Sequence, residues 1–331
     1  MLQSLLGRVH VAALPMRTTF RGITVREVAL IEGPEGWGEF SPFTEYDDGE
    51  ALLWLMSACE AAFEKRNVPL RNSIRVNATL PAVNSEEEIE KILSLYPGVE
   101  VVKVKVGTSL QSDLERIKKV QAIAPHLRIR LDANGLWSVA EAEEFIAAFS
   151  EVIPIQLVEY IEQPCATLVE LRELKSKLKV PVKIMADELI RKTQDPFSLD
   201  LAGAVDVIML KVSPLGGIQR SLKIAKHFGL PVVVSSALES AIGISYGLQL
   251  AAEIPDLSYD CGLATGALFT RDVAELPIRS GAIALESVTP NAQSLNELSA
   301  SADRQIWWRN RIERVWQLGM EKVSVERGWQ K

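Results

Sequence analysis

The sequence predicts an α/β fold in which a closed (β/α) barrel lies beside a smaller α+β domain. From about residue 75 to residue 262 one pattern recurs: a β-branched strand, a turn and an amphipathic helix. This alternation implies parallel strand pairing, and about eight such strands favour a closed barrel over an open, doubly wound sheet. A chain of 331 residues has room for a barrel and one smaller companion domain.

Each expected strand is rich in β-branched residues and is followed by turn residues. The expected strands are residues 75–79, 101–106, 128–132, 157–162, 182–187, 206–211, 231–236 and 258–261. Helical periodicity is present in residues 112–124, 138–150, 168–178 and 216–229. The last of these helices closes on Gly229, shortly before Pro231, and both residues are typical stop signals.

The two ends of the chain do not follow this rhythm. Near the N-terminus a strand-like run, a Gly/Pro-rich turn and a helix-like run occupy residues 24–33, 33–43 and 49–67. Near the C-terminus, residues 278–290 are strand-like and residues 303–318 are helix-like, with Trp307, Trp308 and Trp316 as expected packing residues. We therefore expect residues 1–72 and 285–331 to build one α+β domain, and residues 73–284 to form the barrel.

Composition and charge exclude several classes of function. The formal net charge is −7 and no long basic run is present, so we expect no nucleic-acid partner. There is no signal-peptide pattern, and no uncharged apolar run reaches the length of about 18 residues that a membrane helix needs. Cys59, Cys165 and Cys261 form no CxxC pair, as is usual for reduced thiols. We expect a cytoplasmic protein without membrane insertion, and make no prediction of its oligomeric state.

Charged residues recur at the ends of five successive strands. In the strand at 101–106, Lys103 and Lys105 share one face and valines occupy the other, because side chains alternate across a strand. The valines suit the helix-facing side, so the lysines point into the barrel. The same alternation points four more side chains inward: those of Asp132, Glu162, Asp187 and Lys211. Barrel enzymes place catalysis at the carboxyl ends of strands, which makes this ring the candidate active site.

The chemistry of this ring indicates a metal. Three converging carboxylates raise one another's pKa unless a cation neutralises them. Ligand sets made only of oxygen select a hard divalent ion, Mg²⁺ or its possible substitute Mn²⁺, over Zn²⁺. The structural alternative is a ring of ion pairs that merely fixes the barrel, although buried ion pairs are a poor source of stability. A metal that binds a substrate carboxylate, flanked by lysines that move protons, suits proton removal α to that carboxylate.

The motifs that carry these residues resemble those of the enolase superfamily. They read VKVKVG, RLDANGLW, VEYIEQPC, MADELI and LKVSPLGG. Four further motifs, FRGITVRE, GWGEFSPFTEYDD, VSSALESAIG and DCGLATGALF, are similar to the o-succinylbenzoate synthases of the menaquinone pathway, especially those of actinobacterial type. The resemblance covers nearly the whole chain. It implies a modified (β/α)8 barrel of the (β/α)7β, TIM type, with both chain ends forming a capping domain.

The resemblance also implies roles for the strand-end residues. The Mg²⁺ ligands would be Asp132, Glu162 and Asp187. Lys105 and Lys211 would be the acid/base lysines on opposite faces of the substrate, with Lys103 as an electrostatic helper. The implied reaction is that of a hydro-lyase, syn dehydration of 2-succinyl-6-hydroxy-2,4-cyclohexadiene-1-carboxylate to o-succinylbenzoate through an enediolate.

The remaining candidates concern substrate binding. Such a substrate is a small-molecule dicarboxylate that also carries a ketone, so donors beyond the metal are needed. The candidates are Asn134, Arg21, Ser235, Ser236 and Gly262. Three alternatives stay open: an N-succinylamino acid racemase or dipeptide epimerase with the same lysine pair, a barrel aldolase with a Schiff base at Lys211, and a barrel without catalytic activity.

Overall fold

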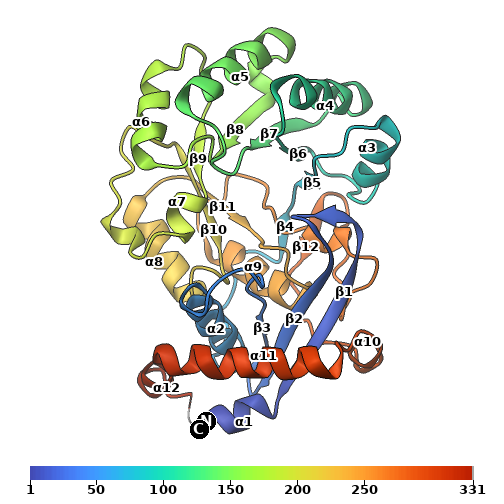
Figure 1. Cartoon of the computed structure of the whole chain (residues 1–331), viewed down its shortest axis with the longest axis vertical. Coiled ribbons are helices and arrows are strands. Elements are labelled where there is room, and N and C mark those ends of the chain that lie inside the picture. The colour runs from blue at the N-terminus through green and yellow to red at the C-terminus, as the bar shows by residue number, and fades with distance from the viewer. Residues whose placement is uncertain (330–331) are drawn as a thin grey trace.

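A curled, seven-stranded parallel sheet forms the centre of the molecule. The computed structural model describes residues 1–329. The sheet runs in the order β11-β10-β9-β8-β7-β6-β5 and is drawn in the upper part of Figure 1. Its strands are β5 (Ala78–Leu80), β6 (Val101–Lys105), β7 (Arg128–Asp132), β8 (Val158–Glu162), β9 (Ile184–Ala186), β10 (Val207–Lys211) and β11 (Val232–Ser235).

Helices alternate with these strands and cover the outside of the sheet (Figure 1). They are α3 (Glu86–Leu93), α4 (Leu110–Ile123), α5 (Val139–Val152), α6 (Leu168–Lys177), α7 (Glu188–Arg191), α8 (Ile218–Phe228) and α9 (Ala241–Glu253). Short helical turns η1 (Ile155–Leu157), η2 (Pro196–Ser198) and η3 (Thr265–Leu268) lie in the connections. The α/β barrel class expected from the sequence is confirmed.

Single parallel bridges close the barrel between its first and last strands. Gly262 bridges to Ser235 at the end of β11, and Cys261 bridges to Val76, just before β5. The eighth strand expected at residues 258–261 is therefore wrong as a regular strand, because this part of the chain makes only two isolated bridges to its neighbours. At Gly262 the approach is so close that a Cβ would overlap the Ser235 side chain. Glycine is required there by space.

The inward and outward alternation of side chains is confirmed. Ile129, Leu131 and Ile161 pack in the apolar layer between the strands and the outer helices. The opposite faces of the strands fill the barrel interior with one small cluster, Tyr160, Met185, Val207, Met209 and Val233. Glu162, Asp187 and Lys211 each lie two residues beyond a member of this cluster, so they point to the same interior face.

Side chains fix the helix boundaries. At α5, Ser138 accepts the Glu141 N–H while the Glu141 carboxylate accepts the Ser138 N–H, a reciprocal cap. The helix expected at 216–229 begins only at Ile218, because Gly216 and Gly217 have φ of 85° and 107°. It ends at Gly229 in the left-handed conformation, as its stop signals predict.

The two ends of the chain pack together against one side of the barrel (lower part of Figure 1). The N-terminal part contains α1 (Leu2–Leu6), an antiparallel sheet in the order β1-β2-β3 and α2 (Asp48–Phe63). The sheet strands are β1 (Val9–Phe20), β2 (Ile23–Gly33) and β3 (Gly36–Phe40). The C-terminal part contains α10 (Ala292–Glu297), α11 (Ala302–Val315), the π-helical turn η4 (Trp316–Met320) and α12 (Glu321–Glu326).

We call this unit the capping domain. Its core combines Trp54 from the N-terminal part with Trp308 and Trp316 from the C-terminal part, while Trp307 packs at the edge, as expected. A two-stranded sheet of β4 (Ser73–Arg75) and β12 (Ala282–Ala284) lies where the chain enters and leaves the barrel. We propose boundaries at residues 1–72 and 285–331 for the capping domain, and 73–284 for the barrel.

Strand β1 was not expected from the sequence. Pro15 interrupts its β-branched pattern and polar residues occupy its second half. It is nevertheless twelve residues long, because its first half pairs with β2 from Val9 opposite Ile31 to Pro15 opposite Val25. Pairing across the turn, rather than local preference, makes this strand.

Glu60 of α2 joins the capping domain to the barrel. This buried carboxylate accepts hydrogen bonds from the Ile218 N–H at 2.5 Å and the Tyr246 hydroxyl at 2.6 Å, and pairs with Arg327 at 2.9 Å. We expect Glu60→Ala to lower the free energy of unfolding by about 3–5 kcal/mol, because it leaves the buried Tyr246 hydroxyl and the buried Ile218 N–H without an acceptor and removes one partner of Arg327. Urea unfolding measures the change.

A matched control lies one helical turn away. Glu64 pairs with the same Arg327 and accepts the Trp329 indole N–H at 2.9 Å, but it is partly exposed, so Glu64→Ala should cost less than Glu60→Ala, about 1–2 kcal/mol. Equal losses in the two variants would contradict the role given to Glu60.

Candidate active site

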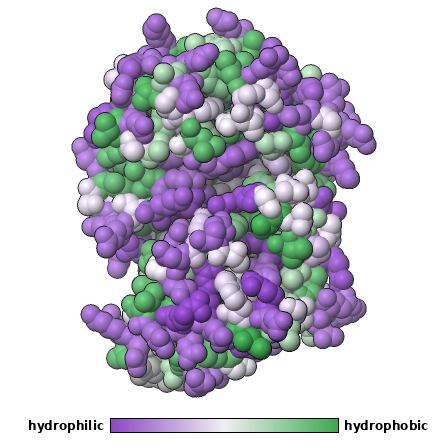
Figure 2. Space-filling model, viewed as in Figure 1, coloured by the Kyte–Doolittle hydropathy of each residue, from purple (hydrophilic) through white to green (hydrophobic). Residues whose placement is uncertain are grey.

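A cavity of about 800 Å³ opens at the carboxyl ends of the barrel strands. The barrel contributes seven of the candidate residues to its wall: Lys103, Lys105, Asp132, Asn134, Lys211, Ser235 and Ser236. The capping domain contributes the turn between β1 and β2, with Arg21, and the segment before α2. In the space-filling view, hydrophilic side chains gather in the hollowed band between barrel and capping domain (Figure 2).

Glu162 and Asp187 lie directly beneath this wall. Both carboxylates are almost completely buried and contact the lysines that line the cavity. The Lys103 ammonium lies 3.1 Å from Glu162 and 3.2 Å from Asp132. Burial favours the neutral amine, but the charges of these two carboxylates outweigh burial and raise the pKa of Lys103. Lys103 is therefore a fixed positive charge at the centre of the site.

The three carboxylates differ in their tendency to ionise. Burial, reinforced by the negative charge of Asp132, raises the pKa of Glu162 to about 8. Burial would also raise the pKa of Asp132, but the ammonium groups of Lys103 and Lys105 outweigh burial and lower it. The same balance, with Lys211 and Arg191 as the cations, lowers the pKa of Asp187. Glu162 is the carboxylate that lacks enough positive charge around it.

The two lysines proposed for acid/base chemistry have different surroundings. The Lys211 ammonium donates to Asp187 at 2.5 Å and is nearly buried. No carboxylate within residues 1–329 lies at ion-pair distance from the Lys105 ammonium. Burial, only partly offset by Asp132, lowers the pKa of Lys105. Lys105 thus becomes a neutral amine more readily than an ordinary lysine side chain does.

Strand order places these lysines on opposite walls of the barrel. Strands β7, β8 and β9 separate β6, which carries Lys105, from β10, which carries Lys211. On the other side, β11, the closing segment at Cys261 and Gly262, and β5 separate them. Three strand positions thus separate the two lysines in either direction around the barrel. A substrate that lies between them presents one face to each lysine.

The carboxylates stand on adjacent strands. Asp132 of β7 is in register with Glu162 of β8, and Asp187 directly follows β9. Residues 1–329 contain no group of three acidic, histidine or cysteine side chains close enough together to hold a metal ion. The carboxylates of the site contact lysine ammonium groups instead. The donor set still fits a hard divalent ion, because it consists only of oxygen and because the raised pKa of Glu162 indicates a deficit of positive charge.

Gln163, which the sequence analysis missed, holds Asp187 in place. Its buried side-chain oxygen accepts the N–H groups of Asp187 at 3.0 Å and Leu189 at 3.1 Å. Its own φ is 41°, in the left-handed region that non-glycine residues rarely adopt. Arg191 was also missed, and it lies 3.2 Å from the Asp187 carboxylate. The sequence signal was that Gln163 stands inside the motif VEYIEQPC, directly after Glu162, and that Arg191 directly follows the motif MADELI.

Asn134 supports the Asp132 side of the site. It has φ of 50°, and its N–H donates to the Asp132 carboxylate at 3.3 Å. Its side-chain amide donates to Glu188 at 3.1 Å, and Glu188 also pairs with Arg191 at 2.7 Å. Asn134 lines the cavity and at the same time links the ends of two strands.

Arg21 reaches the mouth of the cavity from the capping domain. It occupies the turn between β1 and β2 with φ of 51°. Its guanidinium lies 3.9 Å from the centre of the Phe43 ring, 3.3 Å from the Tyr46 hydroxyl and 3.8 Å from the Glu45 carboxylate. Arg21 is therefore held at the rim by the segment before α2.

Ser235 and Ser236 lie on the opposite part of the rim from Asn134 along the strand order. The Ser236 hydroxyl is 2.7 Å from the Thr265 hydroxyl and donates to the Gly262 carbonyl at 2.9 Å. Gly262 itself lies behind these serines and is not among the residues that line the cavity. Both hydroxyls are thus near the cavity, whereas Gly262 acts as their acceptor.

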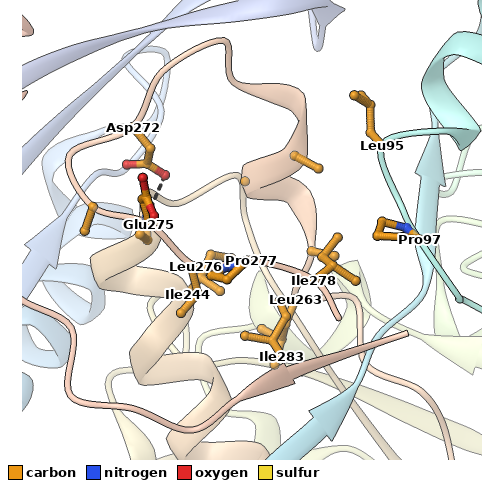
Figure 3. A pocket seen from close by; sticks show the side chains of 15 residues that line it. Leu95, Pro97, Ile244, Leu263, Asp272, Glu275, Leu276, Pro277, Ile278 and Ile283 are labelled. Atoms are coloured by element: carbon orange, nitrogen blue, oxygen red, sulfur yellow. Dashed lines mark hydrogen bonds between the residues drawn. The ribbon is translucent and has the colours of Figure 1, made fainter. Parts of the chain in front are cut away.

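A second pocket of about 360 Å³ lies away from the strand-end charges. Figure 3 shows it lined mainly by apolar side chains such as Leu263 and Ile283, with Asp272 and Glu275 together at one end. The Asp272 carboxylate accepts the Ala241 N–H at 2.9 Å, so it belongs to the start of α9. None of the strand-end lysines lines this pocket, so it is not the candidate active site.

Comparison with known proteins agrees with the fold. Residues 87–289 match a family model described as enolase C-terminal domain-like, and residues 11–62 match one described as enolase N-terminal domain-like. Fold and site together define a barrel enzyme whose reactive groups stand at strand ends beneath a capping domain.

Relatives with high sequence identity indicate which family of barrel enzymes the chain belongs to. A protein of Mycobacterium marinum named o-succinylbenzoate synthase is 49% identical over 322 residues, 96% of either chain. A Mycobacterium tuberculosis protein of the same name is 48% identical over the same coverage. The chain belongs to the enolase superfamily and, within it, to the family of the o-succinylbenzoate synthases.

Solved structures at lower sequence identity share the fold. The muconate lactonizing enzyme from Pseudomonas putida aligns with a TM-score of 0.70 at 19% identity, over 88% of this chain and 98% of that one. The 2-chloromuconate cycloisomerase from Rhodococcus opacus aligns with a TM-score of 0.73 at 21% identity and the same coverage. At this level of identity the likeness concerns the fold alone.

Among the described residues, no helix is both long enough and apolar enough to cross a membrane.

Proposed function

We propose that the protein is an o-succinylbenzoate synthase of menaquinone biosynthesis. This carbon-oxygen lyase removes water from 2-succinyl-6-hydroxy-2,4-cyclohexadiene-1-carboxylate in a syn dehydration that yields o-succinylbenzoate. The relatives at 48–49% identity support the activity. The observation that carries the mechanism is the asymmetry of the lysines: among residues 1–329 no carboxylate lies at ion-pair distance from Lys105, whose pKa is lowered, whereas Lys211 is paired with Asp187.

Lys105 is the base in this proposal. As a neutral amine it takes the α-proton of the substrate, which leaves an enediolate. The resulting ammonium then gives that proton to the hydroxyl that departs from the same face, so that water leaves and the ring becomes aromatic. One residue thus performs both proton transfers, which accounts for the syn course.

Lys211 acts by charge from the opposite face. Its ammonium is paired with Asp187, and in this proposal it stabilises the negative charge of the enediolate without moving a proton. Lys103, held between Asp132 and Glu162, adds a second fixed positive charge. This division of roles is what a dehydration requires, whereas a racemase needs one base on each face.

Members of the enolase superfamily generally use Mg²⁺ beside a lysine or histidine base. In this chain Asp132, Glu162 and Asp187 would hold Mg²⁺, with Mn²⁺ as a possible substitute. When bound, the ion supplies positive charge that binds the substrate carboxylate and makes its α-proton more acidic. Gln163 and Asn134 keep two of the three carboxylates in position.

The cavity is suited to a small dicarboxylate. Its volume of about 800 Å³ falls within the range of about 300–1,000 Å³ typical of small-molecule sites. We assign Arg21, Ser235 and Ser236 to the succinyl end and Asn134 to the metal end, while Gly262 contributes only through the serines. A cytoplasmic location is supported by three cysteines that are all free.

An assay of the purified protein tests this function. With the cyclohexadiene carboxylate and Mg²⁺, we expect turnover in the range of about 1–10³ s⁻¹ that is typical of enzymes. The same protein is offered N-succinylamino acids in D₂O, with α-proton exchange followed by NMR. Absence of dehydration together with rapid exchange would instead identify a racemase, and a borohydride-trapped adduct at Lys211 would identify an aldolase.

A further inference from the structure

One wall of the cavity depends on an unusual backbone turn. Ser235, Ser236, Ala237 and Leu238 line the cavity between the end of β11 and the start of α9. Leu238 has φ of 65°, in the left-handed region that is costly for a residue with a bulky side chain. Such a conformation persists only where neighbouring groups hold it, and here those groups come from the capping domain.

Arg26 of β2 is the first of these groups. It is only 2% exposed, and its Nε donates to the Leu238 carbonyl at 3.1 Å while Nη2 donates to the Ser41 carbonyl. Its guanidinium also lies 4.2 Å from the centre of the Phe43 ring, which lines the cavity on the capping side. Arg26 does not itself line the cavity, so it can influence the substrate only through the residues it holds.

Glu39 of β3 is the second group. It is 3% exposed, and its carboxylate accepts from the Ser240 hydroxyl at 2.5 Å, the Ser240 N–H at 3.1 Å and the Gly243 N–H at 3.0 Å. A Cβ at Gly243 would lie 2.5 Å from the Glu239 side chain and 2.9 Å from the Glu39 carboxylate, so both glutamates crowd this position. Glu39 of the capping domain thus caps the N-terminus of α9. It binds the end of the turn at Ser240, whereas Arg26 binds the middle of the turn at Leu238.

The first turn of α9 has no free donors left for a ligand. Besides the donors taken by Glu39, the Ala241 N–H donates to Asp272 at 2.9 Å and the Ile242 N–H to the Ser240 hydroxyl at 3.2 Å. Glu239, also buried, accepts the Ala237 N–H at 2.5 Å within the turn itself. These contacts make the helix start an anchor for the cavity wall and not a binding site for an anion.

We propose that Arg26 and Glu39 are positioning residues which, from the capping domain, hold residues 235–240 in the shape that binds the substrate. The catalytic lysines stand on strands of the barrel and do not depend on this contact. Loosening the wall therefore weakens substrate binding more than it slows the chemical step. The kinetic part of this inference rests on the proposed function, but the backbone part does not.

The experiment uses Arg26→Met, Arg26→Lys and Glu39→Gln in the full chain. Glutamine replaces one acceptor oxygen by a donor that faces the N–H groups of α9, and methionine removes both donors of Arg26. We expect KM to rise about tenfold, the effect of losing one charge-assisted hydrogen bond, with kcat within about threefold. Arg26→Lys keeps one donor and the charge, so its KM should lie between wild type and Arg26→Met.

Hydrogen-deuterium exchange of the peptide that spans residues 235–243 gives a readout without substrate. Exchange there should be at least about tenfold faster in Arg26→Met and Glu39→Gln than in wild type. The matched control is Glu27→Gln, which alters the next residue of β2. The Glu27 carboxylate accepts from Arg304 at 2.6 Å and Trp308 at 2.9 Å, both on α11 and away from the wall. This control should lower Tm without changing KM or exchange in 235–243.

Two results would overturn the inference. If Arg26→Met and Glu39→Gln lower Tm but leave KM and local exchange as in Glu27→Gln, their role is only structural. If kcat falls tenfold or more at unchanged KM, they act on the chemical step. Should Arg26→Met not fold, Arg26→Lys and Glu39→Gln decide the question. An inactive wild type would refute the proposed function, while the exchange data would still decide whether the two residues hold the wall.

Discussion

Lys105→Ala should lower kcat for dehydration by at least about 10²–10⁴-fold, which corresponds to roughly 3–5 kcal/mol of transition-state stabilisation. Lys105 lines the cavity, and burial lowers its pKa toward the range in which an amine is a useful base. Without it, no other described group on β6 can take the α-proton and return it to the hydroxyl. Steady-state kinetics on the cyclohexadiene carboxylate measures the loss.

Arginine at the two lysine positions separates base from charge. Lys105→Arg should be as inactive as Lys105→Ala, because a guanidinium cannot lose its proton. Lys211→Arg should keep more activity than Lys211→Ala, because Lys211 is proposed to act by charge and its partner Asp187 remains. For a racemase, both arginine variants would be inactive, since each face then needs a base.

Lys183 provides the control for these variants. It lies just before β9, at the opposite end of the barrel strands, and its ammonium bonds the Tyr259 hydroxyl at 2.8 Å. Lys183→Ala should leave kcat within about twofold of wild type, as expected for surface changes away from a site. A Lys105→Ala enzyme within tenfold of wild type would refute the role assigned to Lys105.

Removal of the metal should abolish turnover, and added Mg²⁺ or Mn²⁺ should restore it. The three carboxylates supply an oxygen-only set, and Glu162 in particular lacks sufficient positive charge around it. We expect Glu162→Gln to weaken metal binding by at least about 100-fold, because it removes a direct ligand. Loss of a group that only hydrogen-bonds to a ligand already lowers metal affinity by about 10–100-fold. Calorimetric titration with Mg²⁺, or the Mn²⁺ resonance signal, measures binding without substrate.

Asp206→Asn is a matched control for that experiment. Asp206 precedes β10 at the far end of the strands, where it accepts the Ile184 N–H at 2.8 Å and pairs with Lys175. Its loss should change stability and leave metal affinity unchanged. Full activity after EDTA treatment, or unchanged metal affinity in Glu162→Gln, would mean that the carboxylates form only a structural ion-pair ring with Lys103 and Lys211.

The sequence was a good guide to the barrel because alternation is a property of the backbone. Lys103 and Lys105 share a face with no help from tertiary structure, and the valines between them reveal which face is inside. The same rule applied to β7, β8, β9 and β10 predicted which strand-end charges line the cavity or lie directly beneath it. Local patterns were also sufficient for the helices that begin at a capping box or end at a glycine.

Features that depend on distant partners were not predictable. Strand β1 forms because β2 pairs with it, and the expected eighth strand is reduced to two bridges, one to Ser235 and one to Val76. Gln163 carries no signal of its role, since its partner is the backbone of Asp187, on the next strand. Arg26 and Glu39 look like ordinary charges of a β-hairpin until the fold sets them against residues 238–243.

The sequence by itself thus determined the α/β class, the inward set of charges and the order of those charges around the barrel, because periodicity fixes side-chain direction within each strand. Tertiary structure alone decided that Lys211, and not Lys105, is paired with a carboxylate, and how deeply each carboxylate is buried. It also decided how Arg26 and Glu39 of the capping domain contact the cavity wall. Those properties depend on distances and on exclusion of water, and both arise only when segments remote in sequence pack together.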